Sequence, residues 1–193
     1  MDSHKVMDIF YEDTKLNISA KYLKPGFAFG GSCLPKDLRA LNHKAAEAGV
    51  STPLLQALTV SNNEQIKRGL DMIIATGKKS VGVLGISFKV GTDDLRESPV
   101  VEVIRQLLVK GVNILVYDGN VSITKLPDKH HIKSMLSGNM DKVLKKSDVI
   151  VIGNSNPEFA TIAEKLRPEQ IVIDFVRIRE IEETHANYHG ICW

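Results

Sequence analysis

The sequence predicts an α/β protein in which a helical segment precedes a domain built on a parallel sheet. Two observations carry this prediction. First, apolar residues recur at helical spacing in three early stretches, at 1–20, 35–49 and 53–76. Second, short β-branched strands alternate with helical patterns from Ser80 onward. We place the boundary between a region 1–77 and a region 78–193 at Gly77-Lys78-Lys79.

The limits of the second and third helices are marked by residues that start or stop helices. Pro35 falls near the first turn of the second helix and Gly49 just past its end. Pro53 opens the third helix, with Ser51 and Thr52 as candidate caps. At about 1.5 Å per residue the third helix is roughly 36 Å long. Its apolar residues fit an intramolecular core and a subunit interface equally well: Leu54, Leu55, Leu58, Ile66, Leu70 and Ile73.

The second region alternates strands and helices. Strands are expected at 80–86, 113–118, 148–154 and 170–175, a weak one around His131-Ile132, and helices at 98–110, 139–147 and 157–167. Because right-handed crossovers are the short route between parallel strands, this order predicts a parallel sheet with helices on both faces. The second region is therefore expected to be Rossmann-like.

A Rossmann-like domain does not have to bind a dinucleotide. The loop after the first strand lacks GxGxxG, and Asp118 lies well beyond the roughly 20 residues at which an acidic residue reads the ribose. The same loop carries Lys89, Thr92 and Arg96 ahead of a helix entered through Ser98 and Pro99. These residues suit an anionic ligand at a helix N-terminus, or are simply solvated loop charges.

Composition excludes several classes of partner. The 193 residues have a formal net charge of +2, and their basic residues are dispersed, which argues against nucleic-acid and membrane-surface binding. No apolar run reaches the roughly 18 residues of a membrane span, and the start has no signal region. Cys33 and Cys192 stand alone, without metal-ligand spacing. We expect a cytoplasmic protein without a metal site.

The segment from Lys24 to Asp37 is rich in glycine and proline and delivers Cys33 to the first turn of a helix. There, free amides, the helix dipole and Lys36 all favour the thiolate. Read alone, Cys33 is either a reactive thiol or a small buried apolar residue. Asp37 is either a first-turn acid favoured by the dipole or a base directed at the cysteine.

Two long motifs and the end of the chain carry a resemblance to a known family. They are GFAFGGSCLPKD at 26–37 with LRAL after it, GISFK and TDDLRESP within 85–99, and GICW at 190–193. This pattern resembles the UDP-glucose/GDP-mannose dehydrogenase family, in the spelling of its GDP-mannose branch. The similarity spans nearly all of the chain.

The resemblance implies an NAD-dependent nucleotide-sugar 6-dehydrogenase of polysaccharide biosynthesis that oxidises GDP-mannose to GDP-mannuronate in two hydride transfers. It implies that the Cys33 thiolate attacks the intermediate aldehyde, giving a thiohemiacetal and then a thioester. Asp37 resembles the acid-base partner, and Lys36 and Arg96 resemble contacts to NAD. Family members begin with an NAD-binding domain whose GxGxxG is absent here. NAD would thus be bound mostly by that domain, and turnover by this chain alone is not expected.

The resemblance also assigns a substrate site and a dimer. The residues that match the nucleotide-sugar site are Lys21, Tyr22, Lys24, Phe27, Gly30 and Lys89. The helix 53–76 would form a homodimer. Alternatives are a UDP-sugar dehydrogenase acting on glucose or N-acetylmannosamine, and a non-catalytic nucleotide-sugar-binding and dimerisation module. A cysteine hydrolase or redox protein is disfavoured, because no second cysteine lies near Cys33 and no histidine forms a recognisable dyad motif.

Overall fold

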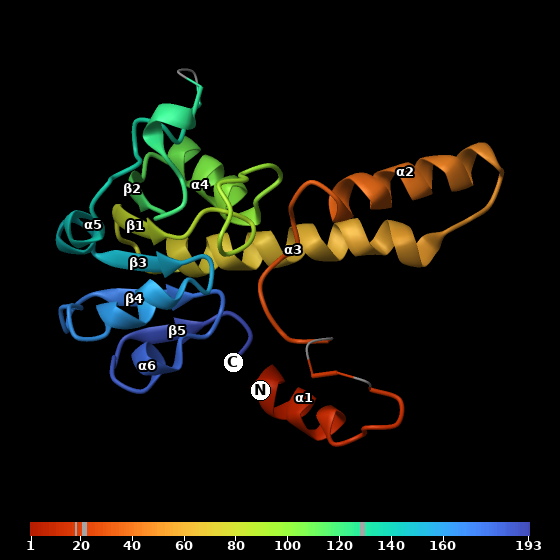
Figure 1. Ribbon diagram of the computed structural model, residues 1–193, viewed down its shortest axis with the longest axis horizontal. Coiled ribbons are helices and arrows are strands. Elements are labelled where there is room, and N and C mark those ends of the chain that lie inside the picture. The colour runs from red at the N-terminus through yellow and green to blue at the C-terminus, as the bar shows by residue number, and fades with distance from the viewer. Residues whose placement is uncertain (18, 21–22, 128–129) are drawn as a thin grey trace.

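The computed structural model describes residues 1–17, 19–20, 23–127 and 130–193. Three helices precede the sheet: α1 (Ser3–Tyr11), α2 (Leu34–Glu47) and α3 (Pro53–Ala75). In Figure 1, α2 and α3 form an antiparallel pair that projects from an α/β unit, and α1 lies apart, near both termini. Asn42 ties the far end of the pair together, because it donates to the Leu55 carbonyl and accepts from Thr52.

The sheet is parallel throughout, with the order β2-β1-β3-β4-β5 among the described residues. Its strands are β1 (Ser80–Leu84), β2 (Asn113–Tyr117), β3 (Val149–Ile152), β4 (Ile171–Asp174) and β5 (Tyr188–Gly190). Val81 pairs with Ile114 on one side and Val149 on the other, so β1 is an interior strand. Every residue of β3 is buried, as expected for a strand covered on both faces. This confirms the predicted fold class.

Successive residues of each strand point to opposite faces of the sheet and belong to two hydrophobic cores, one on each face. Val81, Val83 and Val151 face the core that holds α4 (Pro99–Val109) and the end of α3. Leu84 and Ile152 face the core that holds α5 (Met140–Lys146), the 3₁₀ helix η2 (Pro157–Ile162) and α6 (Arg179–Glu182). The period of two along each strand explains this division.

The long helix α3 has two halves with different surroundings. Leu70 and Ile73 are buried in the first core, and each contributes roughly 1.5–3 kcal/mol by burial. Leu54 and Leu58 in the first half are exposed. The apolar stripe is therefore intramolecular core at one end and unpartnered surface at the other. No helix in the part of the chain that the structure describes is long and apolar enough to cross a membrane.

Several elements differ from the sequence expectations. The first helix ends at Tyr11, because the Asp13 carboxylate accepts from the amides of Lys15 and Leu16 and turns the chain. Thr52 is the N-cap of α3, but its hydroxyl donates to Asn42 and caps nothing.

Further differences lie in the second region. No strand forms at His131-Ile132, where a turn leads to one bridge between Val116 and Leu136. The helix expected at 157–167 is a shorter 3₁₀ segment. Beyond the expected elements lie another 3₁₀ helix, η1 (Ile123–Lys125), and both α6 and β5.

Candidate functional site

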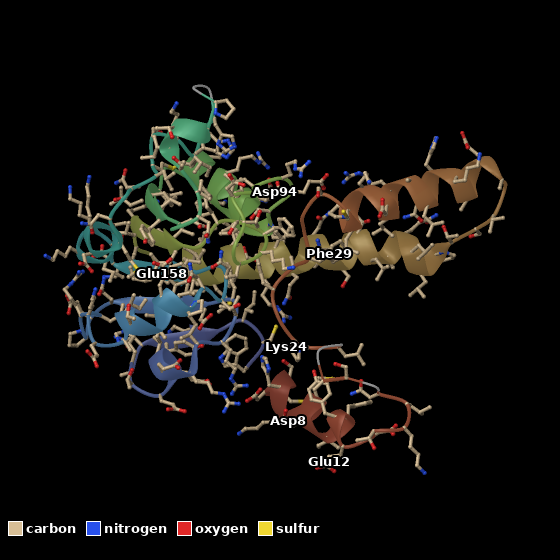
Figure 2. All side chains as sticks on the ribbon, viewed as in Figure 1. Asp8, Glu12, Lys24, Phe29, Asp94 and Glu158 are labelled. Atoms are coloured by element: carbon tan, nitrogen blue, oxygen red, sulfur yellow. The ribbon has the colours of Figure 1, made fainter. Side chains whose placement is uncertain are left out.

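The segment between α1 and α2 leads to Cys33 and is held by polar side chains of α3. The amide of Phe29 donates to Asn62 Oδ1, and Asn62 Nδ2 donates back to the Phe29 carbonyl, both at 2.9 Å. One turn later Gln65 Nε2 donates to the Gly26 carbonyl at 3.1 Å. Figure 2 shows Lys24 and Phe29 at successive points along this segment as it rises from α1 toward α2. The polar residues Asn62 and Gln65 of α3 thus anchor the segment before the cysteine.

Phe27 is packed into the junction between the two regions. Its ring stacks on Phe175, which follows β4, with 4.1 Å between centroids and 14° between planes. Gly69 of α3 lies under both rings, and a Cβ there would come within 2.8 Å of Phe27 and 2.9 Å of Phe175. A glycine inside a helix is unfavourable, and this close approach accounts for it. The predicted substrate role of Phe27 stays a prediction.

Cys33 stands at the N-cap position of α2 with its side chain exposed. Its carbonyl accepts the amide of Asp37 at 2.8 Å, which closes the first helical turn. Pro35 lies in that turn. The expectation that the loop delivers Cys33 to a helix start is confirmed. At this position the thiol is next to the positive end of the helix dipole.

The two charged residues after Cys33 are both exposed. Lys36 Nζ lies 3.4 Å from Asp37 Oδ1. An ion pair of this kind contributes little to stability and leaves both groups free to meet a ligand. Their proposed roles, Asp37 as acid-base partner and Lys36 as an NAD contact, stay predictions.

A loop from the second region, residues 85–98 between β1 and α4, covers the turn before Cys33. A Cβ on Gly31 would lie 2.7 Å from the Phe88 ring, and one on Gly30 would lie 2.5 Å from Pro99 Cδ. Gly31 also has φ of +87°, and its amide donates to the Glu97 carbonyl at 3.4 Å. Both glycines are needed because two backbones meet here.

A pair of charged side chains joins this loop to α2. Arg39 donates hydrogen bonds from both terminal nitrogens to the Glu97 carboxylate, one of them at 2.8 Å. Arg96, on the same loop, makes two hydrogen bonds with Asp94, which raise the pKa of Arg96. The proposed role of Arg96 as a contact to NAD stays a prediction.

The other predicted residues lie further along the same surfaces. Lys24 is exposed and interacts electrostatically with His4 of α1. Lys89 is exposed on the loop 85–98. Lys21 and Tyr22 lie outside the described residues. Sequence reasoning missed Arg39, Glu97 and Phe88 as site residues, because only the folded chain brings them together.

The side chain of Asp118, at the end of β2, points into the interior of the protein. Its Oδ2 accepts from the amides of Ile86 and Ser87, at 2.9 and 3.0 Å, and from the Ser87 hydroxyl at 3.0 Å. In a dinucleotide-binding domain the corresponding acid binds the ribose. Here the carboxylate instead fixes the start of the loop 85–98, so this domain does not present it to a ribose.

The parallel sheet with helices on both faces, behind a helical segment, places the chain among Rossmann-like α/β proteins. Residues 1–64 match the central domain of the UDP-glucose/GDP-mannose dehydrogenase family, and residues 82–180 match the UDP binding domain of the same family. The chain belongs to the UDP-glucose/GDP-mannose dehydrogenase family.

Similar proteins include nucleotide-sugar dehydrogenases of two specificities. The chain is 41% identical to a GDP-mannose 6-dehydrogenase of Pseudomonas putida and 32% identical to a UDP-glucose 6-dehydrogenase of Rickettsia bellii, over 100% and 88% of its length. It spans 46% and 41% of those proteins. A crystal structure of a ternary complex of GDP-mannose dehydrogenase from Pseudomonas aeruginosa matches 98% of the chain and 45% of its own, with 40% identity and a TM-score of 0.82.

A second solved structure matches at lower identity. It is a UDP-glucose dehydrogenase from the archaeon Pyrobaculum islandicum, with 26% identity and a TM-score of 0.85, over all of this chain and 44% of its own. The chain therefore matches less than half the length of each of these relatives.

Proposed function

We propose that this chain is the carboxy-terminal part of an NAD-dependent nucleotide-sugar 6-dehydrogenase that oxidises GDP-mannose to GDP-mannuronate in the cytoplasm. The observation that carries the proposal is Cys33, an exposed thiol at the start of α2, in a segment that contacts the loop 85–98 through Gly31 and Glu97. Family membership supports the reaction class, and 41% identity to a GDP-mannose 6-dehydrogenase supports the substrate.

In the proposed mechanism Cys33 holds the aldehyde formed from the C6 alcohol. Its thiolate adds to the carbonyl carbon to give a thiohemiacetal, whose oxidation gives a thioester, and water then releases the carboxylate and the thiol. Asp37, one turn along α2, moves the protons of these steps. NAD, when bound, accepts the two electrons of each oxidation.

The residues at the site fit one end of an anionic cofactor. Lys36 on α2 and Arg96 on the loop 85–98 are exposed cations, each in an ion pair with a neighbouring aspartate. The 193 residues contain no GxGxxG, so we propose that most of the NAD is bound by a domain outside this sequence. Lys24 and Lys89, with Lys21 and Tyr22, would hold the nucleotide sugar.

Two alternatives are favoured by specific observations. The matched domain at 82–180 is described as UDP binding, and the 32% identical relative is a UDP-glucose 6-dehydrogenase, which favours a UDP-sugar substrate. The absence of the dinucleotide fingerprint favours a nucleotide-sugar-binding and dimerisation module when the chain is isolated.

Substrate oxidation by the longer protein, with its dinucleotide-binding domain, tests the proposal. NADH absorbance and product chromatography should show two NADH per GDP-mannose consumed, with GDP-mannuronate as the product. UDP-glucose and UDP-N-acetylmannosamine at the same concentration should react at least about tenfold more slowly. Faster oxidation of either UDP-sugar would assign the substrate to the alternative.

A further inference from the structure

Glu97 is the residue at which the loop 85–98 meets both the turn before Cys33 and the helix after it. Its carbonyl accepts the amide of Gly31 and lies against Gly30. Its carboxylate receives two hydrogen bonds from Arg39 on α2. One residue thus contacts the nucleophile's segment on both sides of Cys33.

The position of Glu97 is fixed by its own region. Its φ of +51° is unusual for a residue with a side chain. The next residue, Ser98, is buried, and its hydroxyl donates to the Ile86 carbonyl at 2.6 Å. Ile86 is in turn held by Asp118. Glu97 is therefore attached to the carboxyl ends of β1 and β2 and forms a rigid point against which α2 can be placed.

We propose that Glu97 and Arg39 are a positioning pair that holds Cys33 in register with the loop 85–98. This proposal rests on the proposed function, in which Cys33 is the nucleophile. The pair joins residues 58 positions apart and connects the two regions. Arginine suits the task because its planar fork fixes orientation, which a lysine point charge does not.

The exposure of the pair supports a geometric role. The side chains of Arg39 and Glu97 are 59% and 43% exposed, and ion pairs at such positions contribute little to stability. The hydrogen bonds from Arg39 lower the pKa of Glu97, so the carboxylate stays ionised at neutral pH. What the pair determines is where the cysteine segment lies relative to the loop 85–98.

Turnover of GDP-mannose by the longer protein tests the proposal. The double variant Arg39→Gln with Glu97→Gln removes the pair and leaves the net charge unchanged. The kcat of acid formation should fall about three- to tenfold, while KM for GDP-mannose stays within about twofold. The reason is that a cysteine segment no longer held against the loop 85–98 places its thiol less often in the reactive position.

A matched pair lies on α4. Glu102 and Arg105 are also joined by two hydrogen bonds but stay within one helix. The variant Glu102→Gln with Arg105→Gln removes the same charges and should react at the wild-type rate. The exchanged pair, Arg39→Glu with Glu97→Arg, should restore the rate to within about twofold of wild type, since the bridge re-forms.

A wild-type kcat in the Arg39/Glu97 double variant, or a change in KM alone, overturns the proposal. So does equal slowing in the α4 control, or an exchanged pair that stays as slow as the double variant. Circular dichroism checks folding. If the double variant does not fold, Arg39→Lys decides: loss of the fork must lower kcat, and an unchanged kcat overturns the pair. Normal turnover by Cys33→Ala would instead remove the proposed function, so the two failures are distinguishable.

Discussion

Gly30 shows how a single residue controls the approach of the two regions at the cysteine. A Cβ at this position would overlap Pro99 Cδ and the carbonyl of Glu97. Neither neighbour can move away easily to make room for a Cβ, because Pro99 begins α4 and Glu97 is fixed beside buried Ser98. The loop and the cysteine segment therefore fit together only with glycine here.

We expect Gly30→Ala to destabilise the chain by about 1–3 kcal/mol, because an overpacked contact forces a backbone shift. Urea unfolding followed by circular dichroism measures the change. Gly26→Ala is the control, since nothing lies within 4 Å of a Cβ there and its φ is not in the left-handed region. Equal stability of the two variants would show that the close approach does not exist in solution.

At the scale of elements, α1 is docked on the end of the chain by a charged and aromatic cluster. Asp2 caps α1 and accepts from Arg177, while His4 meets the edge of Trp193 with 5.1 Å between centroids. Burial, followed by Arg177, lowers the pKa of His4 below its usual 6.5. Burial raises the pKa of Asp2, but hydrogen bonds from Arg177 and the His4 and Lys5 amides leave it lowered overall.

Both shifts predict that α1 undocks as the pH falls. The unfolded or undocked state takes up the His4 proton below about pH 6.5, before the docked state does, so docking weakens from there downward. The stabilisation from Asp2 is lost further down, as the pH passes below its usual 3.8. Trp193 is the sole tryptophan, so its fluorescence should change between pH 7 and 5. His4→Gln should abolish this change, and a flat wild-type titration would contradict the docking.

The first half of α3 predicts a dimer. Its exposed Leu54 and Leu58 lie beside α2, which exposes Leu34 and Leu41. We propose that a second copy covers this apolar surface, because apolar residues gathered on one face are typical of an interface. Leu58→Asp would bury an unpaired charge there, which costs several kcal/mol.

Light scattering over a concentration series measures the dimer. The wild-type chain should have the mass of a dimer, and Leu58→Asp that of a monomer. Val109→Asp is the control, because Val109 is an exposed apolar residue at the end of α4, away from this surface. A wild-type monomer at every concentration would rule out this interface.

The elements that the sequence predicted well are those with local signals. Pro35 and Pro53 mark the first turns of α2 and α3, and β-branched residues mark β1 and β3. Local signals failed for β5, whose three residues Tyr188–Gly190 form a sheet edge without an apolar run. They also overextended α1, where one carboxylate, that of Asp13, ends the helical pattern.

The same distinction applies to the candidate site: features with a local signal in the sequence were predicted, and contacts between distant segments were not. The position of Cys33 at a helix start follows from adjacent residues and was predicted. The Arg39–Glu97 pair and the stack of Phe27 on Phe175 depend on contacts between distant segments. No periodicity or spacing reports such contacts, so they required the structure.

At the scale of the whole molecule, we propose that the chain supplies one part of an active site. Cys33, Lys36 and Arg96 are arranged at an exposed surface, and the dinucleotide fingerprint is absent from the 193 residues. We therefore predict that the purified chain forms no NADH from NAD with GDP-mannose or UDP-glucose. Sustained, enzyme-dependent absorbance at the NADH band would show that the cofactor site is misplaced.

The central claim is that Cys33 is the nucleophile, and product analysis of Cys33→Ala in the longer protein tests it most directly. Acid formation from GDP-mannose should fall by at least about 10³-fold, because no thiol holds the aldehyde. Cys192→Ser should keep its activity, since serine can replace the hydrogen bond that Cys192 makes with the Gly26 carbonyl. GDP-mannuronate formation by Cys33→Ala at the wild-type rate would contradict the account.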